Sequence, residues 1–242
     1  MNISCIIPAY NEASRISRIL EVVTNHPLID EIIVIDDGSS DNTSEIVESF
    51  AGINLIVHRE NKGKSRTMVT GIQAAQGAYL LLLDADLIGL TQQNITDLIT
   101  PVISHHADIT ISIRKNSPPF CHFVGFDFIS GERVFSKSLL QSHISEIEKL
   151  PPFGFEVFVN KLLMSQNKIP QIVLWDNVES PFKYRTFLGR FPIRSDVYMV
   201  KEILSTISVF EVLHQWFWFY RMSRYSVVVG RFKKTSERKL IK

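Results

Sequence analysis

The sequence has little of what several large classes of protein depend on. It contains only two cysteines, Cys5 and Cys121, which cannot build a disulfide framework or a cysteine-rich zinc site. We expect both to be free thiols in a reducing compartment. The 26 lysines and arginines almost balance the 25 aspartates and glutamates, and the resulting net charge of +1 argues against a whole-domain nucleic-acid binder, which is normally basic.

Long apolar runs and glycine-rich phosphate loops are also missing. No uncharged apolar run reaches the about 18 residues of a transmembrane helix. The N-terminus lacks a basic segment followed by an apolar one, so we expect no signal peptide. No Gly-x-Gly-x-x-Gly follows the first apolar run, which argues against a nicotinamide dehydrogenase. The first glycine is Gly38, which argues against a sugar-nucleotide pyrophosphorylase.

What the 242 residues do contain is a regular alternation of short apolar runs with segments of helical periodicity. The apolar runs predict strands at residues 3–8, 31–35, 53–57, 79–83, 108–113 and 169–175. Helical spacing predicts helices at residues 12–25, 41–50, 65–76, 155–167 and 195–222. This alternation indicates βαβ units, and hence an α/β fold with a mostly parallel central sheet covered by helices on both faces.

Polar clusters follow three of the expected strands, at residues 10–12, 36–37 and 84–86. Because ligands bind at the carboxyl ends of parallel strands, we expect these clusters to meet at one edge of the sheet. Asp84 and Asp86 offer two hard oxygen ligands within one turn, which suits Mg²⁺ or Mn²⁺ bound together with a diphosphate. Such an ion would offset the charge of a leaving group, although a solvated Asp-x-Asp turn has the same sequence.

Two further segments carry groups suited to a nucleotide. Asp36 or Asp37 would accept hydrogen bonds from a ribose or a base, and the same pair also fits a turn followed by a helix cap. Lys64 stands at the start of an expected helix, directly after Gly63. The N-terminal amides of that helix, together with Lys64, suit a phosphate, although the segment does not match the Gly-x-x-x-x-Gly-Lys-Ser/Thr loop.

Four segments, in this order, resemble the signatures of the family-2 glycosyltransferases. They read Ile6-Ile7-Pro8-Ala9-Tyr10-Asn11-Glu12, Val34-Ile35-Asp36-Asp37-Gly38-Ser39-Ser40-Asp41-Asn42-Thr43, Asn61-Lys62-Gly63-Lys64 and Leu82-Leu83-Asp84-Ala85-Asp86. The resemblance implies a GT-A fold and the inverting transfer of a sugar from a UDP- or GDP-linked donor. It also implies that Asp84 and Asp86 hold Mg²⁺ or Mn²⁺, and that Asp86 is catalytic. The residues implied to bind the nucleotide-sugar are Pro8, Tyr10, Glu12, Asp36, Asp37, Lys64 and Asp84.

The second half of the chain resembles parts of this family more loosely. Ser130-Gly131-Glu132-Arg133 is similar to an element of the polyprenyl-phosphate and dolichol-phosphate-mannose-type enzymes. Gly154-Phe155-Glu156-Val157 is similar to a helix start in several relatives, among them the glucosyl-phosphoglycerate synthases. Residues 87–89 lack the glutamine of the first group, and residues 177–180 lack the histidine of the second. The third metal ligand and the type of acceptor therefore stay open.

The acceptor determines which further residues act. A hydroxyl acceptor needs a general base, for which Glu156 is the candidate, whereas a phosphate acceptor is already anionic. Arg114 and Arg133 are the candidates for binding an acceptor phosphate, and we also expect Arg133 to be catalytic. Either arginine could instead pair with a nearby acid such as Glu132. The basic residues expected in a loop over the site are Lys183, Arg185 and Arg190.

The C-terminal segment combines aromatic residues at 209–220 with a basic cluster that runs to Lys242. The combination is typical of a peripheral membrane contact through residues 209–242, although packing on the domain or a dimer interface would use the same residues. We expect a GT-A domain at residues 1–195, with a nucleotide-sugar half at 1–115 and an acceptor half at 116–195. A helical, membrane-proximal extension at 196–242 would follow.

A polyprenyl phosphate or another membrane-associated acceptor, met at the cytoplasmic face of a membrane, fits this arrangement. A soluble phosphorylated or hydroxyl acceptor, as in the phosphoglycerate-type relatives, is the alternative within the same chemistry. An alternative of another class is a catalytically degenerate protein that binds nucleotide as a scaffold. No nucleic acid is expected as a partner.

Overall fold

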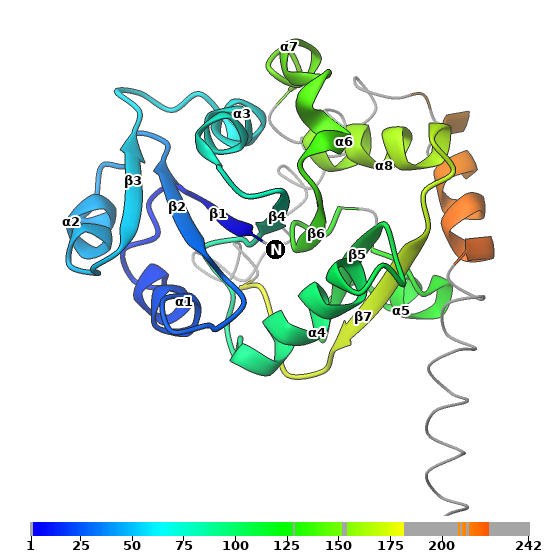
Figure 1. Cartoon of the computed structure of the whole chain (residues 1–242), viewed down its shortest axis with the longest axis horizontal. Coiled ribbons are helices and arrows are strands. Elements are labelled where there is room, and N and C mark those ends of the chain that lie inside the picture. Colours follow the sequence, from blue (N-terminus) through cyan, green and yellow to red (C-terminus); the bar gives the residue numbers. More distant parts are fainter. Residues whose placement is uncertain are drawn as a thin grey trace, which may run out of the picture.

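The computed structural model describes residues 2–127, 129–151, 154–181, 208, 210–211 and 213–222, and its centre is a seven-stranded sheet. The strand order is β3-β2-β1-β4-β6-β5-β7 (Figure 1). The strands are β1 Ile3–Ala9, β2 Glu31–Asp36, β3 Ile53–Val57, β4 Tyr79–Leu82, β5 Ile109–Arg114, β6 Arg133–Ser136 and β7 Pro170–Trp175. All pairings are parallel except the two that β6 makes with β4 and β5. The expected mostly parallel sheet is therefore confirmed.

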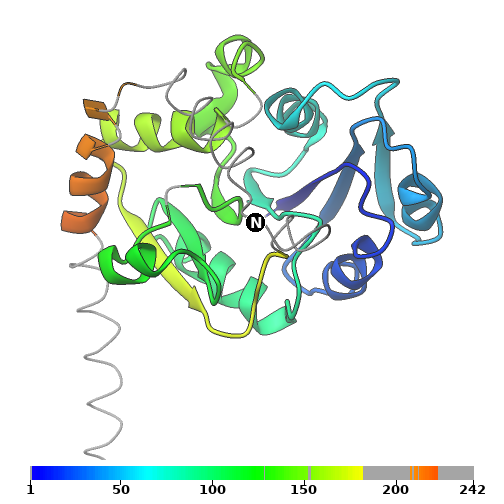
Figure 2. The same cartoon turned by 180° about the vertical axis from the view of Figure 1, so that it is seen from behind.

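Helices cover both faces of the sheet (Figures 1 and 2). They are α1 Ile16–Val23, α2 Thr43–Glu48, α3 Lys64–Ala74, α4 Gln92–Ile103, α5 Pro119–Val124, α6 Ser138–Gln141, α7 Ile144–Ile147 and α8 Phe155–Ser165. One core cluster joins the sheet to α1, α2 and α4, and a second joins it to α3, α6, α7 and α8. Both faces of each central strand are buried, which explains why these strands read as continuous apolar runs rather than alternating ones.

Alternate residues of one strand supply the two core clusters. In β2, Ile32 and Val34 point into the first cluster, whereas Ile33 and Ile35 point into the second. All four are buried. The same alternation holds in β4, where the strand ends one residue before Leu83 and the chain enters the acidic loop. The apolar strands thus hold the polar clusters at the rim of the sheet.

Two expected helix boundaries shift for local reasons, and a third expected helix is described only in part. The helix expected from residue 12 begins at Ile16, because residues 12–15 form a turn in which the Glu12 carbonyl accepts from the amides of Arg15 and Ile16. The helix expected at residues 65–76 ends at Ala74, because Ala75 has an extended backbone. Of the helix expected at 195–222, the described residues 210–211 and 213–222 are helical, and the rest lies outside the described residues.

Strand β6 was not expected from the sequence. It is only four residues long and runs antiparallel between β4 and β5. With β7 it ties residues of the expected acceptor half into the same sheet as the nucleotide-sugar half. The division at residue 115, like the division at 195, stays a prediction.

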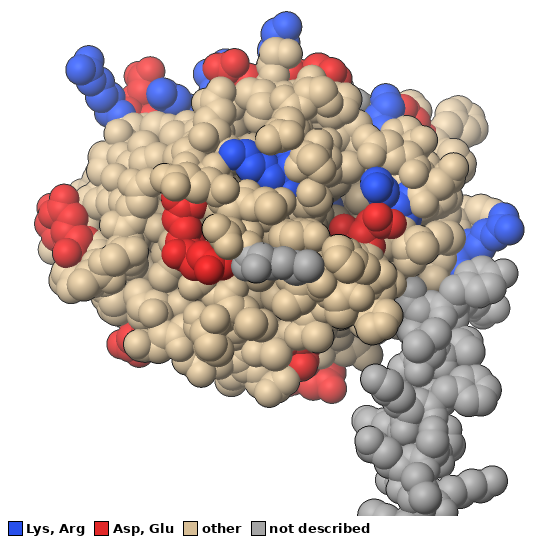
Figure 3. All heavy atoms as spheres, in the orientation of Figure 1, with Lys and Arg blue, Asp and Glu red and all other residues tan. Residues whose placement is uncertain are grey.

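Within the residues that the structure describes, no helix is both long enough and apolar enough to cross a bilayer. Both cysteines are buried and free, and burial raises the pKa of Cys121 to about 12, so a reactive thiolate is disfavoured there. On the face shown in Figure 3, lysines and arginines lie mainly in the upper half of the view and acids in both halves. The distribution of charge on this face therefore does not identify a functional site.

Candidate active site

The loops that follow β1 and β2 are hydrogen-bonded to each other. The Asn11 amide donates to the Ser39 hydroxyl at 2.9 Å, and its side-chain oxygen accepts from the Ser40 amide at 2.8 Å. The Glu12 amide donates to the Thr43 hydroxyl at 2.9 Å. Asn11 has a left-handed backbone (φ 55°), a conformation that asparagine tolerates better than most residues. The first two motifs therefore form one structural unit.

Residues of the first motif face different ways. Pro8 lines a small pocket at the sheet edge, and Tyr10 is 48% exposed beside it in sequence. Glu12 is buried and pairs with Arg15 at 2.6 Å. An exposed tyrosine is free to stack on a base, whereas Glu12 is already engaged by its own loop. The nucleoside contacts expected of these three residues stay predictions.

Asp36 and Asp37 are both buried, and both accept hydrogen bonds from the chain itself. Asp36 accepts from the Ser39 amide at 2.8 Å and from the hydroxyl of Ser44. Asp37 accepts from the amides of Lys62 and Gly63 at 3.0 and 2.8 Å. Two amides that directly precede α3 are thus directed at Asp37. This carboxylate holds the third motif against the second.

A histidine that sequence reasoning missed completes the Asp37 cluster. His58 Nδ1 lies 2.7 Å from an Asp37 oxygen, and its Nε2 lies 3.0 Å from the Thr70 hydroxyl. Burial alone would raise the pKa of Asp37, but the hydrogen bonds from His58 and from the loop amides outweigh it and hold that pKa below its ordinary value. Its position in the sequence could have indicated it, because His58 directly follows β3, as the other polar clusters directly follow their strands.

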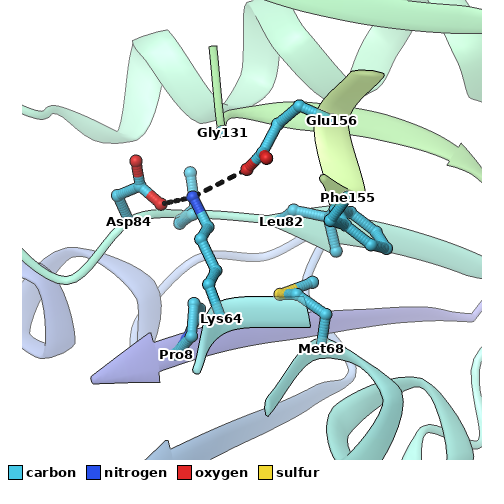
Figure 4. A pocket seen from close by; sticks show the side chains of 9 residues that line it. Pro8, Lys64, Met68, Leu82, Asp84, Gly131, Phe155 and Glu156 are labelled. Carbon is cyan, nitrogen blue, oxygen red and sulfur yellow. Dashed lines mark hydrogen bonds and ion pairs between the residues drawn. The ribbon is translucent and has the colours of Figure 1, made fainter. Parts of the chain in front are cut away.

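Lys64 joins two carboxylates from distant parts of the chain. It is the first residue of α3, preceded by Gly63 with φ 85°. Its ammonium lies 2.8 Å from Asp84 Oδ1 and 2.8 Å from Glu156 Oε1 (Figure 4). Burial would lower the pKa of Lys64, but the two carboxylates more than offset this and raise it above its ordinary value. Lys64 is therefore a fixed positive charge at the centre of the site.

The pocket around this ammonium is built from both halves of the chain. Its lining residues are Pro8, Lys64, Met68, Leu82, Leu83, Asp84, Gly131, Phe155 and Glu156. Figure 4 shows Lys64 reaching up between Asp84 and Glu156, with Met68 and Phe155 forming an apolar side. Glu156 comes from the first turn of α8 and is 5% exposed. A carboxylate is favoured at that end of a helix.

Asp84 and Asp86, the two residues expected to hold a divalent cation, have different surroundings. The carboxylate of Asp84 lies against Gly131, where an added Cβ would come within 2.6 Å of it, so only glycine leaves it room. Asp86 is 5% exposed and accepts from the Ser180 hydroxyl at 3.3 Å. Among the described residues, no group of three or more His, Cys, Asp or Glu side chains could hold an ion. Two carboxylates plus the oxygens of a diphosphate are the usual Mg²⁺ arrangement.

Arg114 links Asp84 to a set of buried acids. Its guanidinium lies 3.1 Å from Glu132, 3.7 Å from Asp127 and 3.9 Å from Asp84. Burial would lower its pKa, but the surrounding carboxylates, Glu132 foremost, raise it above the ordinary value. Arg114 Nε is buried and has no hydrogen-bond partner among the described residues. Arg114 is thus close enough to the site to meet a ligand.

Arg133 is fully buried and directed inward. Its guanidinium donates to the Ser130 carbonyl at 2.7 Å, to Asn160 Oδ1 at 2.7 Å and to the Glu156 carbonyl at 3.3 Å. These contacts tie β6 to the first turns of α8. In this position Arg133 supports Glu156, and the phosphate-binding and catalytic roles expected of it stay predictions. Lys183, Arg185 and Arg190 lie outside the described residues.

The chain is similar to several known glycosyltransferases. Residues 4–123 match the family model "Glycosyl transferase family 2". The chain is 28% identical over 188 residues to a dolichyl-phosphate beta-glucosyltransferase of Dictyostelium discoideum, covering 70% of this chain and 51% of that protein. It is 31% identical over 149 residues to dolichyl-phosphate beta-glucosyltransferase ALG5C of Trichomonas vaginalis, covering 51% and 44%. The chain thus spans about half the length of these curated relatives.

Solved structures with a similar fold include glucosyl-3-phosphoglycerate synthase from Mycobacterium tuberculosis. Its complex with Mn²⁺, UDP and phosphoglyceric acid has a TM-score of 0.69 at 20% identity, covering 89% of this chain and 78% of that one. Its complex with Mg²⁺ and UDP has a TM-score of 0.67, also at 20% identity, covering 85% and 77%. At this identity the likeness shows the fold alone. With four motifs in order, a GT-A fold and the family model aligned to residues 4–123, the chain belongs to glycosyl transferase family 2.

Proposed function

We propose that the protein is a metal-dependent, inverting glycosyltransferase that moves a sugar from a UDP- or GDP-linked donor to a membrane-associated phosphate acceptor. The observation that carries the proposal is the Lys64 ammonium, 2.8 Å from both Asp84 and Glu156. It joins a carboxylate that follows β4 with one at the start of α8. A donor diphosphate and an acceptor would have to meet at that point.

On the donor side, Asp84 and Asp86 would hold Mg²⁺ or Mn²⁺ together with the diphosphate. The ion supplies charge neutralisation for the leaving group. Lys64 adds a second positive charge, and Met68 and Phe155 form an apolar side of its pocket. The relative from Mycobacterium tuberculosis was crystallised with Mn²⁺ and UDP, which supports this reading of the acidic pair.

On the acceptor side, Glu156 and Arg114 are the groups in place. For a hydroxyl acceptor, Glu156 is the base, once the donor has drawn Lys64 towards its diphosphate. For a phosphate acceptor, Arg114 binds the phosphate oxygens and little base help is needed. Two relatives are dolichyl-phosphate glucosyltransferases, which favours a lipid phosphate, and the solved relative binds phosphoglyceric acid, which keeps a soluble phosphorylated acceptor as the alternative.

The C-terminal helix supports the membrane part of the proposal, because its two faces differ. On the inner face, Phe219 is buried and stacks on Phe126 with ring centroids 3.5 Å apart. Its outer face carries Phe210, Leu213 and Phe217, which are 84%, 57% and 67% exposed. Their spacing puts them in one stripe of a helix, and the sequence that follows to residue 242 is strongly basic. An apolar stripe beside cations suits an anionic bilayer at the cytoplasmic face.

A thermal-shift panel tests the donor half of the proposal. Nucleotides and nucleotide-sugars are added with and without Mn²⁺, and the correct base should raise the melting temperature in a metal-dependent way. Asp86→Ala should lose both this shift and the transfer of labelled sugar, by at least about 100-fold. Unchanged transfer in Asp86→Ala with chelator present would contradict the metal assignment. Binding without turnover on a broad donor panel would favour the scaffold alternative.

Solvent extraction of the labelled product tests the acceptor half. Label in the organic phase indicates a lipid acceptor, and label in the aqueous phase indicates a soluble one.

Cosedimentation with phosphatidylglycerol vesicles tests the membrane contact separately. Phe210→Ser, Leu213→Ser and Phe217→Ser, combined, should lower the bound fraction. The matched control Val57→Ser, on the 55% exposed end of edge strand β3, should leave it unchanged. Equal binding of both variants would contradict the stripe.

A further inference from the structure

The segment that follows β7 returns to the acidic loop and pairs with it. Ile88 donates its amide to the Glu179 carbonyl at 2.8 Å, and Glu179 donates back to the Ile88 carbonyl at 2.9 Å. On the other side, the Lys115 amide donates to the Val178 carbonyl at 2.9 Å. The loops after β4, β5 and β7 are therefore joined by backbone hydrogen bonds next to Asp86.

Asn116 fixes the end of this segment. Its Nδ2 donates to the Ser180 carbonyl at 2.6 Å, and its Oδ1 accepts from the Ser180 amide at 3.1 Å. One side-chain amide thus satisfies both backbone groups of Ser180, and only one orientation of the amide does so. The position of the Ser180 backbone is set on two sides, by Asn116 and by the bonds of Glu179 to Ile88.

The consequence is the placement of one hydroxyl. Ser180 Oγ donates to Asp86 Oδ1 at 3.3 Å, across 94 positions of the sequence. This is longer than the about 2.5–3.0 Å of a strong O–H···O bond, and such contacts commonly tighten when a ligand binds. A donor on one oxygen restrains rotation of the carboxylate, and so sets the direction of the lone pairs that a cation would meet.

We propose that Ser180 is a positioning residue for Asp86, and that Asn116 holds Ser180 in place for that task. The inference rests on the proposed function, because it concerns a carboxylate that would hold the cation. Hydrogen-bond partners of metal-binding carboxylates influence affinity because they fix the orientation of the ligand. The side chain of Ser180 contributes its effect through Asp86 and not through the substrate.

Mn²⁺ binding measured by electron paramagnetic resonance, with UDP and with GDP in turn, tests this directly. Ser180→Ala should raise the Mn²⁺ dissociation constant about 10-fold, with kcat largely recovered at saturating Mn²⁺. Ser180→Thr, which keeps the hydroxyl, should restore the affinity. Asn116→Ala should show the same loss, and the double variant no further loss, because both substitutions remove one contact. The matched control is Ser104→Ala, whose hydroxyl bonds within the end of α4.

Three results would overturn the inference, and they are distinguishable. Equal Mn²⁺ affinity of the wild type and Ser180→Ala overturns it alone. An additive loss in the double variant does the same, because Asn116 would then act independently of Ser180. If the wild type binds no Mn²⁺ with either nucleotide, the proposed function fails and takes this inference with it.

Discussion

Buried acids in the two halves of the sheet are satisfied in different ways. In the first half, Asp36 and Asp37 accept hydrogen bonds from backbone amides of adjacent loops. In the second half, Glu132 and Asp127 lie against the guanidinium of Arg114. Backbone amides are present whatever the side chains are, whereas an ion pair exists only if both partners are placed together. The first arrangement relies mainly on groups that every backbone carries, whereas the second depends on particular side chains and is therefore more exposed to single substitutions.

This difference predicts a large effect for Glu132→Ala. Glu132 is fully buried and accepts from the hydroxyls of Ser112 and Ser130, both at 2.7 Å, besides pairing with Arg114. Removing it takes the nearest carboxylate from a largely buried guanidinium, which keeps the more distant Asp127 and Asp84, and we expect the free energy of unfolding to fall by about 3–5 kcal/mol in urea denaturation. The control is Glu179→Ala, which breaks an exposed pair with Lys115 and should cost about 1 kcal/mol or less. Similar losses for both would mean that burial of the Glu132–Arg114 pair does not set its contribution to stability.

Asp37→Asn should have a smaller effect that depends on pH. The substitution weakens hydrogen bonds to a charged acceptor, for an expected loss of about 1.5–3 kcal/mol at neutral pH. Because the fold holds the pKa of Asp37 below its ordinary value, the carboxylate stabilises the wild type above its unfolded pKa. That stability is lost as the pH falls through the folded pKa. Urea denaturation at several pH values measures the difference in free energy of unfolding between the wild type and Asp37→Asn. This difference should be constant near neutral pH and become smaller below about pH 4. A constant difference would refute the role of charge.

Gly131→Ala tests the contact between the two halves, where Gly131 lies against Asp84. An added Cβ would lie 2.6 Å from the Asp84 carboxylate, so Asp84 must move. We expect Mn²⁺-dependent donor affinity, measured by calorimetry, to fall about 10-fold. Gly52→Ala is the control, because nothing lies within 4 Å of its added Cβ, although its φ of +79° is strained for alanine. It should lose stability and keep donor affinity. If Gly131→Ala instead lost stability and kept donor affinity, Gly131 would serve the fold and not the site.

The smallest effect on stability is expected for the outer stripe of the C-terminal helix. Phe217→Ser should change the free energy of unfolding by about 0.5 kcal/mol or less, because the side chain is 67% exposed. Phe219→Ser, two positions on, removes the ring stacked on Phe126 and should shift the helix off the domain, as hydrogen exchange would report. Equal protection in the two variants would mean that the inner face does not hold the helix.

Much of the first half could be predicted from sequence, because its information is local. The third strand was predicted at 53–57 and is β3 Ile53–Val57. The clusters after β1, β2 and β4 were expected at one edge, and the strand order places these three strands side by side. Strand β6 was missed, because its four residues are too few to show a periodicity. His58 was missed because no motif contains it.

The sequence by itself determined the sheet and the identity of the acids at its edge, because apolar runs and strand-end clusters are properties of neighbouring residues. Only the tertiary structure decided what those acids contact. Lys64 meets Glu156 across 92 positions, Ser180 meets Asp86 across 94, and the two arginines face buried acids and carbonyls. Those contacts depend on where β6, α8 and the segment after β7 come to lie. That placement results from packing of the whole core, which no short stretch of sequence encodes.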